Sequence, residues 1–187
     1  MQPVFSRNDD VNKTVPTLFK ESLWQQFGAS IDMLRNAIVM WPEEKWKQPR
    51  KFFDMAYHTL FFLDYYLTNP PDTFAPPLSY TLLKEFPEDR IDDIFPERIF
   101  TKREMLDFLD ACRRKCKLVI GNITEENVQI RWVEQDSPRN YLMIELLMYN
   151  MRLVQHHAAQ MNIMLRNDYS FANQSLHFII VVPEDFE

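Results

Sequence analysis

The chain has 187 residues, with 46% hydrophobic side chains and a formal net charge of −6 at pH 7. This length and composition suit one folded domain with a sizeable core, and two glycines in the whole chain are too few for barrels, sandwiches or glycine-rich phosphate loops. The negative net charge and the absence of a sustained basic stripe argue against nucleic acid as a partner. No apolar run has the length of a membrane span or a signal peptide, so we expect a cytoplasmic protein.

Two long helices are predicted in the first part of the chain. The first covers about residues 16–40 and carries apolar residues at three- and four-residue spacing, namely Phe27, Ile31, Leu34 and Ile38. The second covers about residues 50–68, has a broad apolar face and ends at Asn69-Pro70-Pro71.

The stretch from residue 70 to residue 100 follows the second helix and carries six prolines, at positions 70, 71, 76, 77, 87 and 96. A segment of this length without a long helix is unusual inside a compact domain. It is typical of a connection that lets the helices of a bundle depart from simple up-and-down order. The sequence therefore predicts a long proline-rich crossover between the second and third helices.

The third helix is predicted to begin at Thr101, because Thr101 and Glu104 have the spacing of a capping box, and to end near Gly121. Cys112 and Cys116 lie one turn apart on its apolar face. A two-cysteine zinc or redox motif normally has two residues between the cysteines, so we expect this pair to be buried and reduced.

The fourth helix is predicted from the start signal Ser137-Pro138 to about residue 166. Before it, the alternating segment 128–133 indicates a strand, and a second strand signal lies at 176–182. The second strand has two candidate partners, the first strand or another subunit.

Together these elements predict an all-α fold, a four-helix bundle with a long crossover between its second and third helices and a short strand pair near 128–133 and 176–182. The bundle is expected to form a single domain over residues 1–187, in which 167–187 is a C-terminal extension.

Three of the four histidines lie in predicted helices. On the fourth helix, a line of mostly apolar residues at steps of three, four or seven comprises Leu142, Leu146, Tyr149, Leu153, His157 and Met164. His157 therefore faces inward, and His156, about 100° away around the helix axis, flanks the line. Because His58 lies close to the apolar stripe of the second helix, two histidines from separate helices are expected to meet inside the bundle. Such a pair either contributes to a metal site or forms a hydrogen-bonded polar pair.

Four segments between residues 24 and 166 resemble the DinB/YfiT-like superfamily. Their sequences are QQFGASIDMLRNAI, AYHTLFFLDYYL, FTKREMLDFLDACRRKC and YNMRLVQHHAAQMNIMLR, and the second and fourth carry most of the resemblance. The resemblance implies a four-helix bundle with a long crossover that is often dimeric, so we expect a homodimer.

The resemblance also implies a divalent metal, nickel or zinc, held by one histidine of the second helix and an H-x-x-x-H pair of the fourth. The first ligand matches His58, and the second histidine of the pair matches His157. The first histidine of the pair falls at position 153, where this chain has Leu153. The expected metal site is thus an incomplete triad of His58 and His157, with His156 or Asp54 as substitutes for the third ligand, and we expect low metal occupancy.

The resemblance is compatible with two classes of function. A member with bound metal would be a thiol S-transferase, in which the metal lowers the pKa of a low-molecular-weight thiol such as bacillithiol or mycothiol. A member without metal would be a small-molecule-binding dimer. Tyr57, Asp64 and Tyr65 are candidates to line its pocket, and an interface or packing role is the alternative for the two tyrosines. The missing third histidine favours a degenerate metal site and therefore the second class.

Overall fold

The computed structural model describes residues 15–47, 50–82, 94–135 and 137–168. These residues form four long helices, which are α1 (Val15–Met40), α2 (Lys51–Tyr66), α3 (Lys102–Gly121) and α4 (Met143–Asp168). The chain is mainly helical, as predicted, and the first three helices begin and end within two residues of their expected positions. Within the described residues, none of the helices is both long and apolar enough to cross a membrane.

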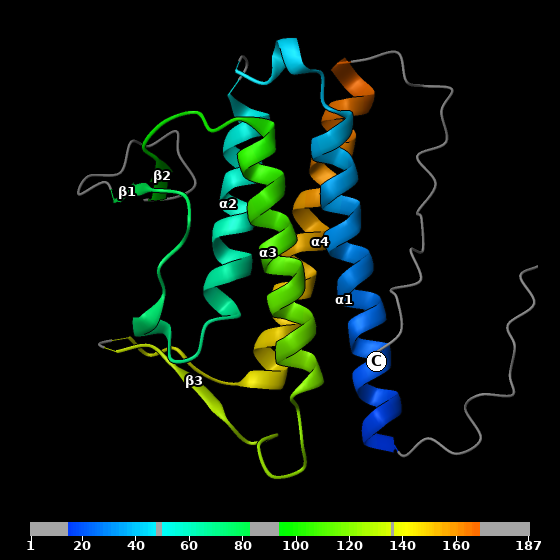
Figure 1. The fold of residues 1–187 in the computed structure, drawn as a ribbon, viewed down its shortest axis with the longest axis vertical. Helices are drawn as coiled ribbons and strands as arrows, with labels where there is room; N and C mark the ends of the chain where they lie inside the picture. The colour runs from blue at the N-terminus through cyan, green and yellow to red at the C-terminus, as the bar shows by residue number, and fades with distance from the viewer. Residues whose placement is uncertain (1–14, 48–49, 83–93, 136, 169–187) are drawn as a thin grey trace, which may run out of the picture.

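The four helices lie side by side (Figure 1). α1 packs against α3 and α4, and α2 packs against the same two helices. α1 and α4 run in one direction, and α2 and α3 run in the other. Between α2 and α3, the described residues form the short 3-10 helix η2 (Pro71–Thr73) and the antiparallel strands β1 (Tyr80–Leu82) and β2 (Ile94–Pro96), which lie beside α2.

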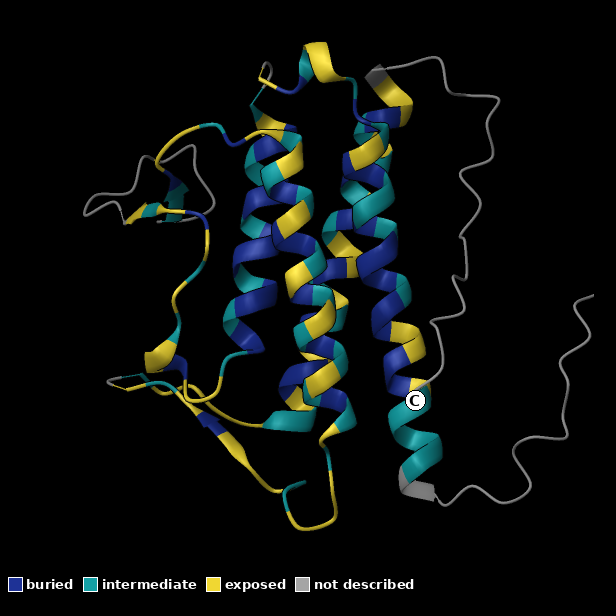
Figure 2. Cartoon of the chain, in the orientation of Figure 1, coloured by how far each residue is buried: buried dark blue, intermediate teal, exposed yellow. Residues whose placement is uncertain are grey.

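The hydrophobic core lies between the four helices, where the buried faces of all of them meet (Figure 2). The apolar line predicted for α1 is confirmed, because its four residues are 0% exposed, namely Phe27, Ile31, Leu34 and Ile38. The core continues past the end of α1, where Trp41 stacks on Phe52 of α2 with 4.0 Å between the ring centroids.

Two short strands precede α4, and one of them overlaps the strand predicted at 128–133. β3 (Arg131–Val133) pairs antiparallel with β4 (Asn140–Leu142). The strand expected at 128–133 is therefore present from residue 131, with β4 as its neighbour among the described residues. The expected partner segment 176–182 lies outside the described residues, as does the C-terminal extension from residue 169 onward.

The hairpin also moves the start of the fourth helix, which begins at Met143 and not at Ser137-Pro138. Trp132 of β3 is 0% exposed, and its Nε1 donates a hydrogen bond of 2.8 Å to the backbone oxygen of Thr68. Tyr66 of α2 packs edge-on against the same indole. Burial of Trp132 holds β3 against the end of α2, and residues 140–142 pair with β3 instead of continuing a helix from Ser137-Pro138.

α3 begins with the predicted capping box, which the structure confirms. The Thr101 hydroxyl accepts a hydrogen bond of 3.2 Å from the backbone N–H of Glu104, and the Glu104 carboxylate accepts one of 2.7 Å from the N–H of Thr101. The guanidinium of Arg98 donates to the same carboxylate. These hydrogen bonds, that of Arg98 first, lower the pKa of Glu104 to about 2.

We expect the charge of Glu104 to make stability depend on pH. Its pKa is 4.5 in the unfolded chain and lower in the folded one, so the ionised carboxyl contributes stability that is fully present above pH 4.5 and is lost as the pH falls towards about 2. Over that range, urea unfolding should show the wild type losing its stability advantage over Glu104→Gln. The exposed Glu126→Gln is the matched control, and a pH-independent difference between wild type and Glu104→Gln would contradict the expectation.

Candidate functional site

The structure brings His58 and His157 together between α2 and α4. Both side chains are half-buried, and the centroids of their rings lie 4.9 Å apart at an interplanar angle of 83°. His58 also packs on Phe62, with 4.8 Å between the ring centroids. Two histidines from separate helices, as the sequence suggests, thus form a contact pair beside the core.

Gln160 lies within hydrogen-bonding distance of the His157 ring. Its Oε1 lies 3.0 Å from Nδ1 of His157. Because an amide oxygen only accepts hydrogen bonds, this contact is a hydrogen bond in the neutral tautomer that carries its hydrogen on Nδ1, and that tautomer has its lone pair on Nε2. A metal or a hydrogen-bond donor of a small molecule requires such a lone pair.

Position 153 lies one helical turn before His157, where the resemblance implies a third ligand. Leu153 is half-buried there and packs beside an aromatic cluster that contains Tyr66 and Trp132. An aliphatic side chain has no lone pair, so this position contributes packing and no coordination.

Neither suggested substitute completes a triad. Asp54 accepts hydrogen bonds of 3.2 and 3.0 Å from the guanidinium of Arg50, and His156 is exposed, with its ring centroid 5.2 Å from that of His157. In the part of the chain that the structure describes, no three or more His, Cys, Asp or Glu side chains are grouped so as to hold a metal. A metal at the pair would therefore be held by the imidazoles of His58 and His157, with water in its other positions.

Three polar residues of α2, for which the sequence left a pocket or a packing role open, make contacts within the fold. The hydroxyl of Tyr57 donates to two backbone carbonyls of the α2–α3 connection, both at 3.1 Å. Asp64 accepts a hydrogen bond from Lys115 of α3, and Tyr65 donates one to Glu134 beside the hairpin. The pKa values of Tyr57 and Tyr65 are raised, and burial is the largest cause for each. Both hydroxyls therefore stay protonated at neutral pH.

The cysteines of α3 belong to the core. Cys112 and Cys116 are free and buried, as predicted. Desolvation raises the pKa of both thiols above the ordinary value. Because a thiol acts as a nucleophile or metal ligand through its thiolate, neither cysteine serves as a reactive group at neutral pH.

The buried face of α4 is rotated by roughly a quarter turn from the line that the sequence suggests. Its buried residues are Leu146, Leu147, Asn150, Val154, Ala158, Met161 and Leu165. Leu142 and Tyr149, which were expected in the core, are 38% and 45% exposed. Because α4 has apolar side chains on both its buried and its outward face, three- and four-residue spacing alone does not choose between them. His157 consequently lies at the edge of the core that faces α2.

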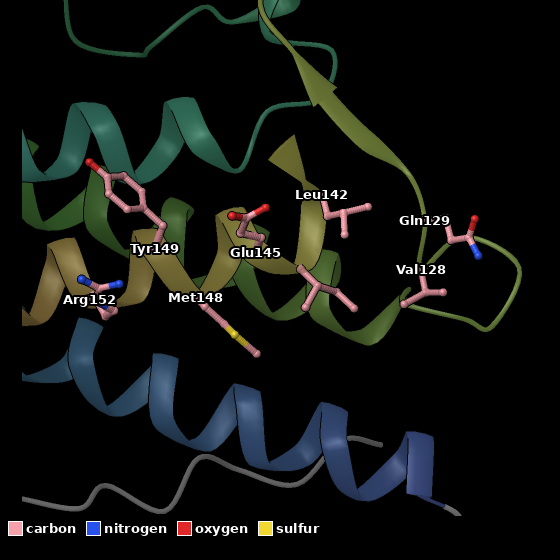
Figure 3. A pocket seen from close by; sticks show the side chains of 8 residues that line it. Val128, Gln129, Leu142, Glu145, Met148, Tyr149 and Arg152 are labelled. Atoms are coloured by element: carbon pink, nitrogen blue, oxygen red, sulfur yellow. The ribbon is translucent and has the colours of Figure 1, made fainter. Parts of the chain in front are cut away.

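The outward face of α4 is hollowed in two adjoining places. The first hollow, of about 560 Å³, lies between α4 and the chain before β3, and Glu145, Met148, Tyr149 and Arg152 line it from α4 (Figure 3). The second, of about 500 Å³, continues along α4 from Tyr149 to His156 and Ala159. Sequence reasoning missed this surface, and the signal that could have found it is the pair Met148-Tyr149 between two charged residues of opposite sign.

Comparison of the chain with models of known families, with curated proteins and with solved structures finds no significant match.

Proposed function

We propose that this chain is a DinB-like four-helix bundle with a proline-rich crossover, and that it acts as a homodimer whose former metal site binds a small molecule through two histidines. The parallel directions of α2 and α3, joined by residues 67–101, support the bundle and its crossover. The contact between the rings of His58 and His157 supports the site and is the observation that carries the proposal.

The chemistry of this pair favours a small polar ligand over a tightly held metal. Two imidazoles supply two ligands, whereas stable transition-metal sites in proteins have three or four. With Leu153 at the third position, water would have to fill the remaining coordination, and metal binding stays weak. The same imidazoles offer hydrogen-bonding groups next to the apolar Phe62 and Leu153, a combination typical of small-molecule sites.

Metal content tests the first part of this assignment. Protein purified without a histidine tag and without added metal is expected to contain less than about 0.1 equivalent of any transition metal. One equivalent of nickel or zinc in the wild type would overturn the two-histidine site and would favour the thiol S-transferase.

Ligand-dependent thermal denaturation tests the second part. In a panel of metabolites and low-molecular-weight thiols, a ligand of the site should raise the Tm of the wild type and of His156→Ala, but not that of His157→Ala. His156 is the matched control because it is the exposed neighbour on the same helix. Equal stabilisation of both variants would place the bound ligand away from the pair.

A further inference from the structure

The outward face of α4 exposes apolar side chains that take no part in the histidine pair. Among the described residues, seven of the nine exposed large hydrophobic side chains lie within residues 130–163, namely Ile130 just before the hairpin and six residues of the hairpin or of α4. Met148, Tyr149 and Ile163 of α4 are 41%, 45% and 55% exposed. These three side chains lie on the outward face of α4, and exposed apolar side chains that share one face mark an interaction surface.

Two charged residues flank the centre of this surface. Glu145 and Arg152 are both exposed and lie seven residues apart in the sequence. Seven residues are close to two turns, so both side chains are on the same side of α4, about 10 Å apart along its axis. Met148 and Tyr149 lie between them (Figure 3). The surface therefore has an apolar centre with one acidic and one basic residue at equal distances from it.

We propose that this surface binds a second copy of the same chain, with the two α4 helices antiparallel and crossing at Met148 and Tyr149. A twofold axis at the crossing places Glu145 of each copy opposite Arg152 of the other, so that two pairs of opposite charge form around the apolar centre. A parallel arrangement in the same register would instead place like charges together. Because this charge pattern is complementary to itself, the partner that it fits is a second copy of the same chain.

The hollow beside the crossing fits the same arrangement. It has a volume of about 560 Å³, and Met148 and Tyr149 line it from α4. In an antiparallel pair, the protruding side chains of one helix enter the hollows of the other, as in other helix–helix contacts. The inference rests on the homodimer of the proposed function, names its interface and is independent of the histidine pair.

Charge reversal tests the register of the two helices. Glu145→Arg makes both flanking positions basic, and Arg152→Glu makes both acidic, so each variant repels its own copy twice. In sedimentation velocity, each variant should be monomeric at a concentration at which the wild type is dimeric. An equimolar mixture of the two variants should recover a dimer, because the basic surface of one then meets the acidic surface of the other.

Arg114→Glu is the matched control, since Arg114 is an exposed arginine of α3. This variant should remain dimeric, and all variants should keep the circular dichroism of the wild type. A monomeric wild type would overturn both this interface and the dimer of the proposed function. A dimeric wild type whose dimer survives both charge reversals would overturn the interface alone, and a mixture that stays monomeric would reject the antiparallel register.

Discussion

Leu153→His should turn a protein with little bound metal into one that holds about one equivalent of nickel or zinc. Residues 153 and 157 are four apart on α4, so their side chains lie on the same face one turn from each other. His157 already contacts His58 across the helices at 4.9 Å between ring centroids, and its contact with Gln160 favours the tautomer with the lone pair on Nε2. A third imidazole would complete the ligand number that zinc requires from a protein.

Metal analysis of the variant and the wild type, purified side by side without a tag, measures this effect. Gln155→His is the matched control, because it adds a histidine to the same helix at an exposed position. It should leave the metal content unchanged, whereas combining Leu153→His with His58→Ala should abolish the gain. Saturating metal at 100 times its Kd should also stabilise the variant by about 2.7 kcal/mol. A Leu153→His protein with no more metal than the wild type would show that the pair is not part of a metal-site geometry.

The first three helices could be predicted closely because local chemistry marks their ends. The capping box of Thr101 and Glu104 satisfies backbone donors within four residues, and Pro42 and Asn69-Pro70-Pro71 stop the first two helices. The start of α4 could not be predicted in this way. Ser137-Pro138 is a good local start signal, but pairing between β3 and β4 overrides it.

Part of the candidate site could likewise be predicted from the sequence, and part could not. That His58 and His157 face each other could be expected from their positions near the apolar stripes of two helices and from the resemblance. The hydrogen-bond partners of the polar α2 residues could not be predicted. Tyr65, for example, donates a hydrogen bond to Glu134, which is far away in the sequence, and local periodicity carries no information on such pairs. The outward face of α4 escaped notice because Tyr149 fits a helical apolar line and is nevertheless exposed.

The largest loss of stability is expected for Trp132→Ala, at about 3–5 kcal/mol. The indole is 0% exposed, and its ring centroid lies 5.3 Å from that of Tyr65 and 5.9 Å from that of Tyr66. Truncation removes this packing and leaves the Thr68 carbonyl without the hydrogen bond from Nε1. Guanidinium unfolding of the variant and the wild type measures the difference in free energy of unfolding.

Two further variants separate the contribution of indole packing from that of the hydrogen bond to Thr68. Val133→Ala changes the next residue of β3, which is 47% exposed, and should cost no more than about 0.5 kcal/mol. Trp132→Phe keeps an aromatic ring and removes the donor, so it should cost about 1–3 kcal/mol. Since the hairpin leads directly into α4, Trp132→Ala should also speed hydrogen exchange in β3, β4 and the first turn of α4 more than in α3. If Trp132→Ala cost no more than Val133→Ala, the hairpin would have to be anchored by something other than the buried indole, and the start of α4 at Met143 would need a different cause.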